Sequence, residues 1–291
     1  MSADTDDKSD WKVVSQFFIV PLALVAVLVS VFFGLQVLRS SHPDPRATLR
    51  HLKGPSRFLL PWAGDPKRWQ SGYDLSLAVR GGGGEGGAAL APEMAAAFRE
   101  AGADPPLRRY LALALGRSGD PRAAPALREG MRDPDGETRL YCAWGLMRIA
   151  DRTFVPDLRA AVGDRDEAVR TMAVFALGEL DDRDGAAVLE AALRDGSMSV
   201  RWNAALSLAR LGNDSGEPVL IGVLEGKETA TDDKVNASAR LNAVRGLALL
   251  RDDAARAALR RAAESGAGDE VSATARLALE SIDAKAPRAL P

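Results

Sequence analysis

The feature that most constrains the fold is a sequence segment that recurs four times between positions 107 and 211. The copies start at Arg108, Arg139, Arg170 and Arg201, each 31 residues after the last, and read RRYLALALGRS, RLYCAWGLMRI, RTMAVFALGEL and RWNAALSLARL. Internal repeats of roughly 20 to 50 residues are typical of arrays in which each unit packs on its neighbours. We therefore expect the 291 residues to form one stacked array.

Each copy has the spacing of an amphipathic α-helix. Apolar residues stand three, four, seven and usually ten places after the arginine, which puts them on one stripe of a helix with about 3.6 residues per turn. Small residues beside this stripe allow neighbouring helices to approach closely. The seventh place is always leucine, in Leu115, Leu146, Leu177 and Leu208. Turns with Asp or Gly, followed by a proline near the start of another helix, separate the copies, so the unit is helix, turn, helix, turn.

The same frame continues in weaker form on both sides of the four copies. Arg68 opens RWQSGYDLSLAV and Arg240 opens RLNAVRGLALL, while Ser272 takes the arginine position in VSATARLALESI. Terminal units of a solenoid are expected to be atypical, because one of their faces has no neighbour. The sequence thus predicts an all-α solenoid with seven second helices over residues 66–285, followed by a short tail at 286–291.

This pattern resembles HEAT repeats, in the short bacterial form that is also found in phycobilisome lyases. In that class an Asp before the second helix and an Arg inside it form a ladder between repeats. Here the ladder positions are Asp133, Arg139, Asp164, Arg170, Asp195 and Arg201, with each Asp six residues before its Arg. The pattern is broken before Arg108, where Gly102 stands, and before Arg240, where Lys234 stands. The resemblance implies a right-handed α-solenoid of HEAT-like helix pairs and a structural role for both ladder residues.

Composition narrows the classes of function. The net charge is −2 and the pI is about 5.9, so no positive field favours nucleic acid. Cys142 is the only cysteine, and its place among small apolar residues predicts a buried side chain. Both histidines, His42 and His51, precede the array, which leaves it without a His cluster or a Ser-His-Asp set. We therefore expect no metal, no cofactor and no enzymatic activity.

Residues 13–38 form an apolar run, VVSQFFIVPLALVAVLVSVFFGLQVL, without a charged residue. At about 1.5 Å per residue it is long enough to cross a bilayer core of roughly 30 Å. The acidic leading segment and the lack of an A-x-A site disfavour a cleaved signal peptide. We expect a transmembrane helix here, after a polar tail at 1–12 and before a juxtamembrane linker at 39–65 with one or two helical turns around 47–52. More basic residues follow the run than precede it, which predicts a single-pass protein of a bacterial inner membrane with a cytoplasmic solenoid.

Two irregular segments interrupt the array. The run RGGGGEGG at 80–87 is not followed by Gly-Lys-Ser/Thr, so we interpret it as a connection between helices rather than a phosphate loop. Residues 225–236, EGKETATDDKVN, insert about eight residues between Arg201 and Arg240. Insertions within repeats fall in loops on one face, often a contacted one. This loop is either a contact surface or merely tolerated length.

The remaining candidate site is the surface of the second helices. Places two and nine after the arginine lie close together and away from the apolar stripe. These places hold tyrosines, arginines and an asparagine, and Trp202 lies beside them. Tyr, Trp and Arg are the residue types that dominate interface hot spots. The candidate docking residues are Tyr110, Arg117, Tyr141, Arg148, Trp202, Asn203 and Arg210. Ordinary boundary packing is the alternative interpretation of these residues.

Two functions are consistent with the sequence. The first is a membrane-anchored scaffold that docks a protein partner, as an accessory subunit of a membrane complex such as a transporter. The second is a phycobilin-lyase-like or chaperone-like enzyme that handles a chromophore or a modified protein at the membrane. The repeat type supports the second function by analogy alone, since fold analogy cannot carry an activity.

Overall fold

The computed structural model describes residues 45–52, 66–79, 88–266 and 270–284, and these residues contain helices and turns but no strand. The α-helices are α3 (Pro45–Leu52), α4 (Pro66–Ala78), α6 (Ala91–Glu100), α7 (Pro105–Ser118), α8 (Ala124–Gly130), α9 (Gly136–Ile149), α10 (Val155–Ala161), α11 (Glu167–Glu179), α12 (Ala186–Ala192), α13 (Met198–Arg210), α14 (Glu217–Leu224), α15 (Asp233–Leu250), α16 (Asp253–Ser265) and α17 (Glu270–Ala284). A single 3-10 turn leads into each of α8, α10, α12 and α14. The prediction of an all-helical fold is confirmed.

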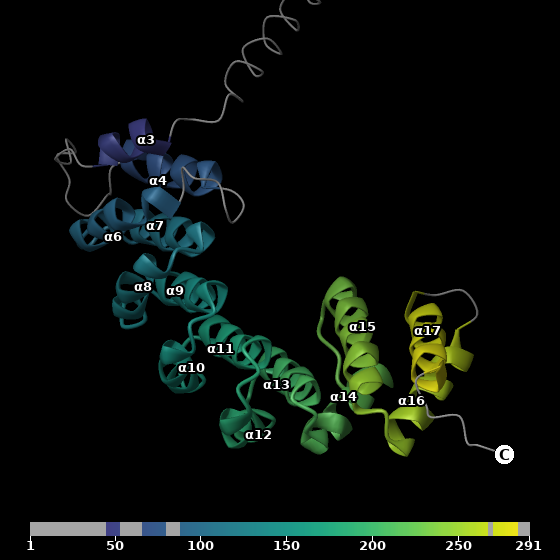
Figure 1. The fold of residues 1–291 in the computed structure, drawn as a ribbon. Helices are drawn as coiled ribbons and strands as arrows, with labels where there is room; N and C mark the ends of the chain where they lie inside the picture. Colours follow the sequence, from purple (N-terminus) through teal and green to yellow (C-terminus); the bar gives the residue numbers. More distant parts are fainter. Residues whose placement is uncertain (1–44, 53–65, 80–87, 267–269, 285–291) are drawn as a thin grey trace, which may run out of the picture.

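The helices form an α-solenoid of stacked pairs. Helices α7, α9, α11 and α13 lie side by side in one row, and α8, α10 and α12 line the other side of that row (Figure 1). Each of the seven expected second helices is present, as α4, α7, α9, α11, α13, α15 and α17. The row changes direction after α13, where α15 stands at an angle to the helices before it (Figure 1).

The second helices pack closely because small residues stand where they touch. A Cβ atom added to Gly116 of α7 would lie 2.7 Å from the Cα atom of Gly145 in α9, a distance that real Cβ contacts do not reach. A Cβ atom added to Gly178 of α11 would lie 2.6 Å from the Cβ atom of Ser207 in α13. The leucine seven places after each arginine is fully buried between these contacts. The core therefore follows the row instead of forming one central cluster.

Eleven places after the arginine, just past the end of each second helix from α7 to α15, stands a residue with a left-handed backbone conformation. The residues with positive φ at this place are Gly119, Ala150, Asp181, Gly212 and Arg251. This conformation turns the chain back toward the next first helix, and glycine adopts it without steric cost. Ala150, Asp181 and Arg251 adopt it at a cost on the order of 1 kcal/mol each.

The packed helices begin earlier than the sequence predicted. Helix α3 lies within the segment 39–65 that was expected to be a linker, and it packs against α4. Leu49 and Leu52 of α3 are buried in the same apolar cluster as Leu75 of α4. The reason is that this short segment supplies an apolar stripe that can cover the outermost second helix.

The expected membrane anchor falls outside the part of the chain that the structure describes. Among the described helices, none combines the length and the apolar composition needed to cross a bilayer. The predicted span at 13–38, the tail at 1–12, the glycine-rich run at 80–87 and the tail at 286–291 all lie outside the described residues.

Candidate protein-docking face

The six ladder residues pair between neighbouring repeats. The guanidinium of Arg139 donates from Nε and Nη2 to the two carboxylate oxygens of Asp164, at 2.8 and 2.7 Å. Arg170 pairs with Asp195 in the same way, at 2.9 and 3.0 Å. Bidentate pairs of this kind are the stronger class of charged hydrogen bond. Each arginine therefore joins its own repeat to the aspartate of the repeat that follows.

Each ladder aspartate also shapes the turn in which it stands. Asp164 accepts a hydrogen bond from the backbone N–H of Asp166 at 2.8 Å, and Asp195 accepts one from Ser197 at 2.8 Å. Arg139 and Arg170 donate from Nη1 to the carbonyl oxygen of the aspartate six places before them, at 2.7 and 3.0 Å. The ladder side chains thus hold both the turn before each second helix and the contact between neighbouring repeats, which is a structural role.

The ladder extends beyond the six residues at both ends. Arg108, which no aspartate precedes in the sequence pattern, pairs forward with Asp133 at 2.5 Å. Arg201 pairs with Glu228 at 3.0 Å, and the indole N–H of Trp202 donates to the same glutamate oxygen at 3.0 Å. Glu228 belongs to the insertion at 225–236, so this loop supplies the last rung.

Several of the predicted docking residues make contacts within the solenoid. Tyr110 packs its ring edge to face on Tyr73 of α4, with 5.4 Å between ring centroids. Arg117 donates to the carbonyl oxygen of Ser76, also in α4. Arg210 pairs with Glu179 of α11 at 2.5 Å. These three side chains take part in packing between repeats, as the alternative interpretation expected, while they still border the outer surface of the row.

The other predicted docking residues differ in their surroundings. Tyr141 is half-buried and packs against the core. Arg148 is exposed, and its guanidinium lies 5.6 Å from the centre of the Trp144 ring. Trp202 and Asn203 line a groove described below. The structure therefore does not gather the seven residues into one cluster.

A row of apolar side chains that the sequence reasoning missed runs along the same surface. These residues stand five places after the arginine of four consecutive repeats, and each is half-buried. They are Leu113, Trp144, Phe175 and Leu206. We call them the apolar row. Their common spacing of 31 residues was the signal that could have found them.

Two grooves flank α13 on this surface. The groove between α11 and α13 has a volume of about 690 Å³ and is lined by Phe175, Met172 and Asn203, with Asp166 and Glu167 at one end. The groove between α13 and α15 has a volume of about 350 Å³. Ser199 and Asn203 line both grooves, so the two form one track across α13.

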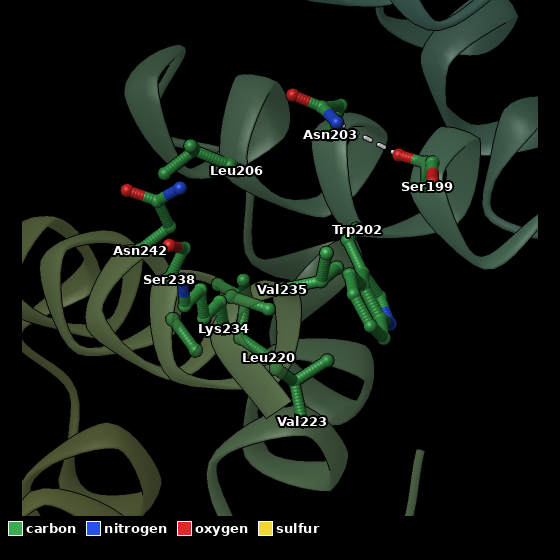
Figure 2. A pocket seen from close by; sticks show the side chains of 12 residues that line it. Ser199, Trp202, Asn203, Leu206, Leu220, Val223, Lys234, Val235, Ser238 and Asn242 are labelled. Atoms are coloured by element: carbon green, nitrogen blue, oxygen red, sulfur yellow. Dashed lines mark hydrogen bonds between the residues drawn. The ribbon is translucent and has the colours of Figure 1, made fainter. Parts of the chain in front are cut away.

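The groove between α13 and α15 is mainly apolar. Figure 2 shows Trp202 and Val235 facing each other, with Leu220 and Val223 of α14 beneath them. Polar side chains border the groove from both helices, Asn203 from α13 and Ser238 and Asn242 from α15 (Figure 2). Asn203 donates to the carbonyl oxygen of Ser199 at 2.8 Å, which leaves its side-chain oxygen as an acceptor.

The titratable groups of the solenoid differ in how they are stabilised. A hydrogen bond from Arg109 lowers the pKa of Asp135 to about 2, and a hydrogen bond from Arg170 lowers the pKa of Asp195. Burial, together with the nearby carboxyl group of Asp252, raises the pKa of Glu217 to about 7. Burial also raises the pKa of the Cys142 thiol, which makes a reactive thiolate unfavourable. The chemistry that this surface offers is recognition through apolar contact, amide hydrogen bonds and charge.

The comparisons with known proteins agree on the fold. HEAT repeats match residues 92–170 and 155–232. The complex of CpcE and CpcF of phycocyanin lyase from Nostoc sp. PCC7120 has a similar structure, with a TM-score of 0.52, 19% identity, and coverage of 82% of this chain and 94% of that one. An engineered protein gives a TM-score of 0.50 at 18% identity, over 83% of this chain and 68% of the other. No curated protein matches the sequence.

The solenoid geometry, the ladder and the repeat match lead to the same assignment. Both solved structures share less than a quarter of their residues with this chain, so their likeness concerns the fold. The chain is a HEAT-like repeat protein, with a phycocyanin lyase among its structural neighbours.

Proposed function

We propose that this protein is a membrane-anchored scaffold whose second-helix surface docks a protein partner. The observation that carries the proposal is the apolar row, which places half-buried Leu113, Trp144, Phe175 and Leu206 on four consecutive helices. Aromatic and apolar residues that are partly exposed and flanked by polar groups are typical of protein interfaces. Stacked repeats extend such a surface over a length that no single helix pair provides.

The membrane anchor in this proposal is supported by the sequence alone. The uncharged run at 13–38 has the length and composition of a bilayer span, and the excess of basic residues after it favours a cytoplasmic solenoid at a bacterial inner membrane. An anchor confines the solenoid near membrane proteins and raises its effective concentration for them. The partner is accordingly a membrane complex, for which this chain serves as an accessory subunit, with a transporter as one example.

The alternative of a lyase-like enzyme rests on the phycocyanin lyase neighbour. That likeness at 19% identity concerns the arrangement of helices. A likeness of this kind assigns no side chain to a chromophore, and the apolar row favours the scaffold function.

The test is recovery of a partner from the native membrane. We would purify the full-length chain in mild detergent, alongside a Phe175→Ala, Leu206→Ala double variant and a Leu277→Ala control. Leu277 is an exposed leucine on α17, away from the apolar row. We expect a stoichiometric membrane protein with the wild type and the control, and its loss with the double variant, which should remain folded with a lowered thermal midpoint. Equal recovery with all three would show that docking does not use this surface.

A further inference from the structure

The proposed docking surface has a shape and a charge pattern that specify its occupant. On the basis of the proposed function, we propose that the partner contributes an amphipathic helix of about 18 residues that crosses the second helices along the apolar row. This helix carries acidic residues along one flank of its apolar stripe and basic residues along the other. The length, the width and the charges of the surface are three separate arguments for a helix of this kind.

The length follows from the number of helices in the apolar row. Leu113 and Leu206 are separated by three helix-to-helix intervals, because they stand on α7 and α13 with α9 and α11 between them. Packed helices lie about 8 to 10 Å apart, so the row is about 27 Å long. At about 1.5 Å per residue, a helix of about 18 residues spans these four helices, and about six more residues would reach Tyr73, the exposed aromatic at the same place of α4.

The width favours a helix over an extended strand. Along α11, the distance from Glu167 near one edge of the surface to Glu179 near the other covers twelve residues. This corresponds to about 18 Å of helix rise. A helix with its side chains is about 10 to 12 Å across, and long charged side chains on both flanks reach the edges. A single strand occupies only about 4.8 Å between neighbours, which leaves most of the width empty.

One edge of the surface is basic. The residues nine places after each arginine stand at the C-terminal ends of the second helices, and they are Arg117, Arg148, Glu179 and Arg210. Glu179 is paired with Arg210. Arg148 is exposed, stacks on Trp144, and forms no ion pair with any residue that the structure describes. A carboxylate on the partner helix would supply the missing counter-charge at Arg148.

The opposite edge is acidic. Asp166 and Glu167 line the end of the groove between α11 and α13. Asp166 accepts a backbone hydrogen bond from Ala168 at 2.9 Å, and Glu167 accepts one from the hydroxyl of Ser197 at 2.6 Å. Within the described ranges, neither carboxylate forms an ion pair, unlike the ladder aspartates. A lysine or arginine on the other flank of the partner helix complements them.

The apolar row stops where the second groove begins. Five places after Arg240 the residue is Arg245 rather than an apolar one, so α15 does not continue the row. The groove between Trp202 and Val235 lies at this end of the row. It accommodates the terminal large apolar side chain of the partner helix, which fixes the register of that helix on the solenoid.

The first test locates the contacting segment by photo-crosslinking in native membranes. The full-length chain carries a photoreactive phenylalanine analogue in place of Phe175, and the control carries it in place of Ala187, which is exposed on α12 behind the row. We expect a crosslink from position 175 alone, to a segment with apolar residues at helical spacing, acids on one flank and bases on the other. A crosslink to an uncharged or extended segment of a partner overturns this inference and leaves the scaffold function in place.

Other crosslinking results separate the two proposals further. Crosslinks from position 175 to lipid, to a second copy of this chain or to its own linker overturn the partner helix. The absence of any crosslink at position 175, together with unchanged partner recovery, overturns the docking surface itself.

The second test concerns the charges and uses the segment identified by the crosslink. Arg148→Glu is expected to weaken binding of the corresponding synthetic peptide about tenfold, with the Arg132→Glu variant as a control on another exposed arginine. Replacing the facing acid of the peptide by arginine should restore binding to Arg148→Glu and weaken binding to the wild type. If the peptide exchange leaves both affinities unchanged, the charge pattern does not orient the helix.

Discussion

The junction of α9 with α11 and the junction of α13 with α15 use the same chemistry at different spacings. In the first, the arginines are 31 residues apart, and the Arg139–Asp164 pair is bidentate with side chains only 6% and 14% exposed. In the second, the arginines are 39 residues apart, and Arg201 reaches Glu228 with side chains 20% and 31% exposed. The insertion preserves an ion pair across the junction but opens a groove between the helices. The longer spacing therefore leaves the ion pair more exposed, while a groove lies beside α13 at the regularly spaced junction with α11 as well.

The largest expected change in stability comes from removing the arginine of each of these two ion pairs. Arg139→Ala should destabilise the protein by about 3 kcal/mol, because it leaves the carboxylate of Asp164 largely buried without its partner. Arg201→Ala should cost about 1 kcal/mol or less, since Glu228 is more exposed and can be solvated. Urea unfolding of both variants measures the difference. Equal losses would show that the two junctions are energetically alike.

A smaller effect is expected from the close approach of α7 and α9. Gly116→Ala would bring its Cβ within 2.8 Å of the Trp144 ring and 2.7 Å of Gly145, which should cost about 2 kcal/mol in overpacking. Gly222→Ala is the matched control in α14, where an added Cβ meets nothing within 4 Å. That change should stabilise by up to about 1 kcal/mol through helix propensity. Thermal unfolding would contradict this account if both substitutions shifted the midpoint in the same direction.

Carboxyl groups elsewhere in the solenoid should respond to pH in opposite directions, the ion-paired Asp135 and Asp195 in one and Glu217 of α14 in the other. Asp135 and Asp195 have lowered pKa values, so their contribution to stability is present above their ordinary values and is lost as pH falls through the folded-state pKa, about 2 for Asp135. Glu217 has a pKa raised to about 7, so its contribution is full below its ordinary value and is lost as pH rises through about 7.

The pH response can be measured at one residue. Glu217→Gln should flatten the dependence of stability on pH between 5 and 8, with a gain of about 1 kcal/mol at pH 8 after allowance for solvent screening. Glu190→Gln in α12 serves as the control. The glutamine at this position can still accept the hydrogen bond from Asn213. A slope that remains in Glu217→Gln would assign the pH response to another group.

The smallest effect concerns the residue that ends each second helix. Ala150 after α9 has φ of 57°, whereas the equivalent residue after α13 is Gly212 with φ of 75°. Ala150→Gly should therefore stabilise by about 0.5 kcal/mol, and Gly212→Ala should destabilise by about 1 kcal/mol. Chemical denaturation of the two variants gives both values. A loss of stability in Ala150→Gly would mean that the entropy of the unfolded chain outweighs the backbone strain.

Much of the fold could be predicted from the sequence because one period determined it. The buried leucines seven places after each arginine follow from the helical repeat, whereas the pairing of Arg139 and Arg170 with the aspartates of the next repeat is what the resemblance to HEAT-like repeats implied. The forward pairing of Arg108 with Asp133 was missed, because the pattern was searched before the arginine within one repeat rather than in the next. One or two helical turns around 47–52 were expected, but the packing of α3 against α4 was not, since two buried leucines in eight residues give too short a signal.

The docking surface was only partly predictable. Places two and nine were chosen because they lie opposite the apolar stripe, yet Tyr110 and Arg117 turn out to contact α4. The apolar residues at place five were overlooked because apolar side chains were assigned to the core, although Trp144 and Phe175 remain partly exposed. The groove beside Trp202 depends on the angle between α13 and α15, which tertiary packing sets and no local pattern encodes.

The direction of the ladder has a consequence for synthesis of the chain. Arg139 pairs with a residue 25 positions later, and so does Arg170, so each guanidinium waits for a carboxylate that leaves the ribosome after it. Each ladder arginine thus pairs with an acidic residue of the repeat that follows it. We therefore expect each ladder pair to form only after the following repeat has been translated, with the Arg201–Glu228 pair forming last in the series.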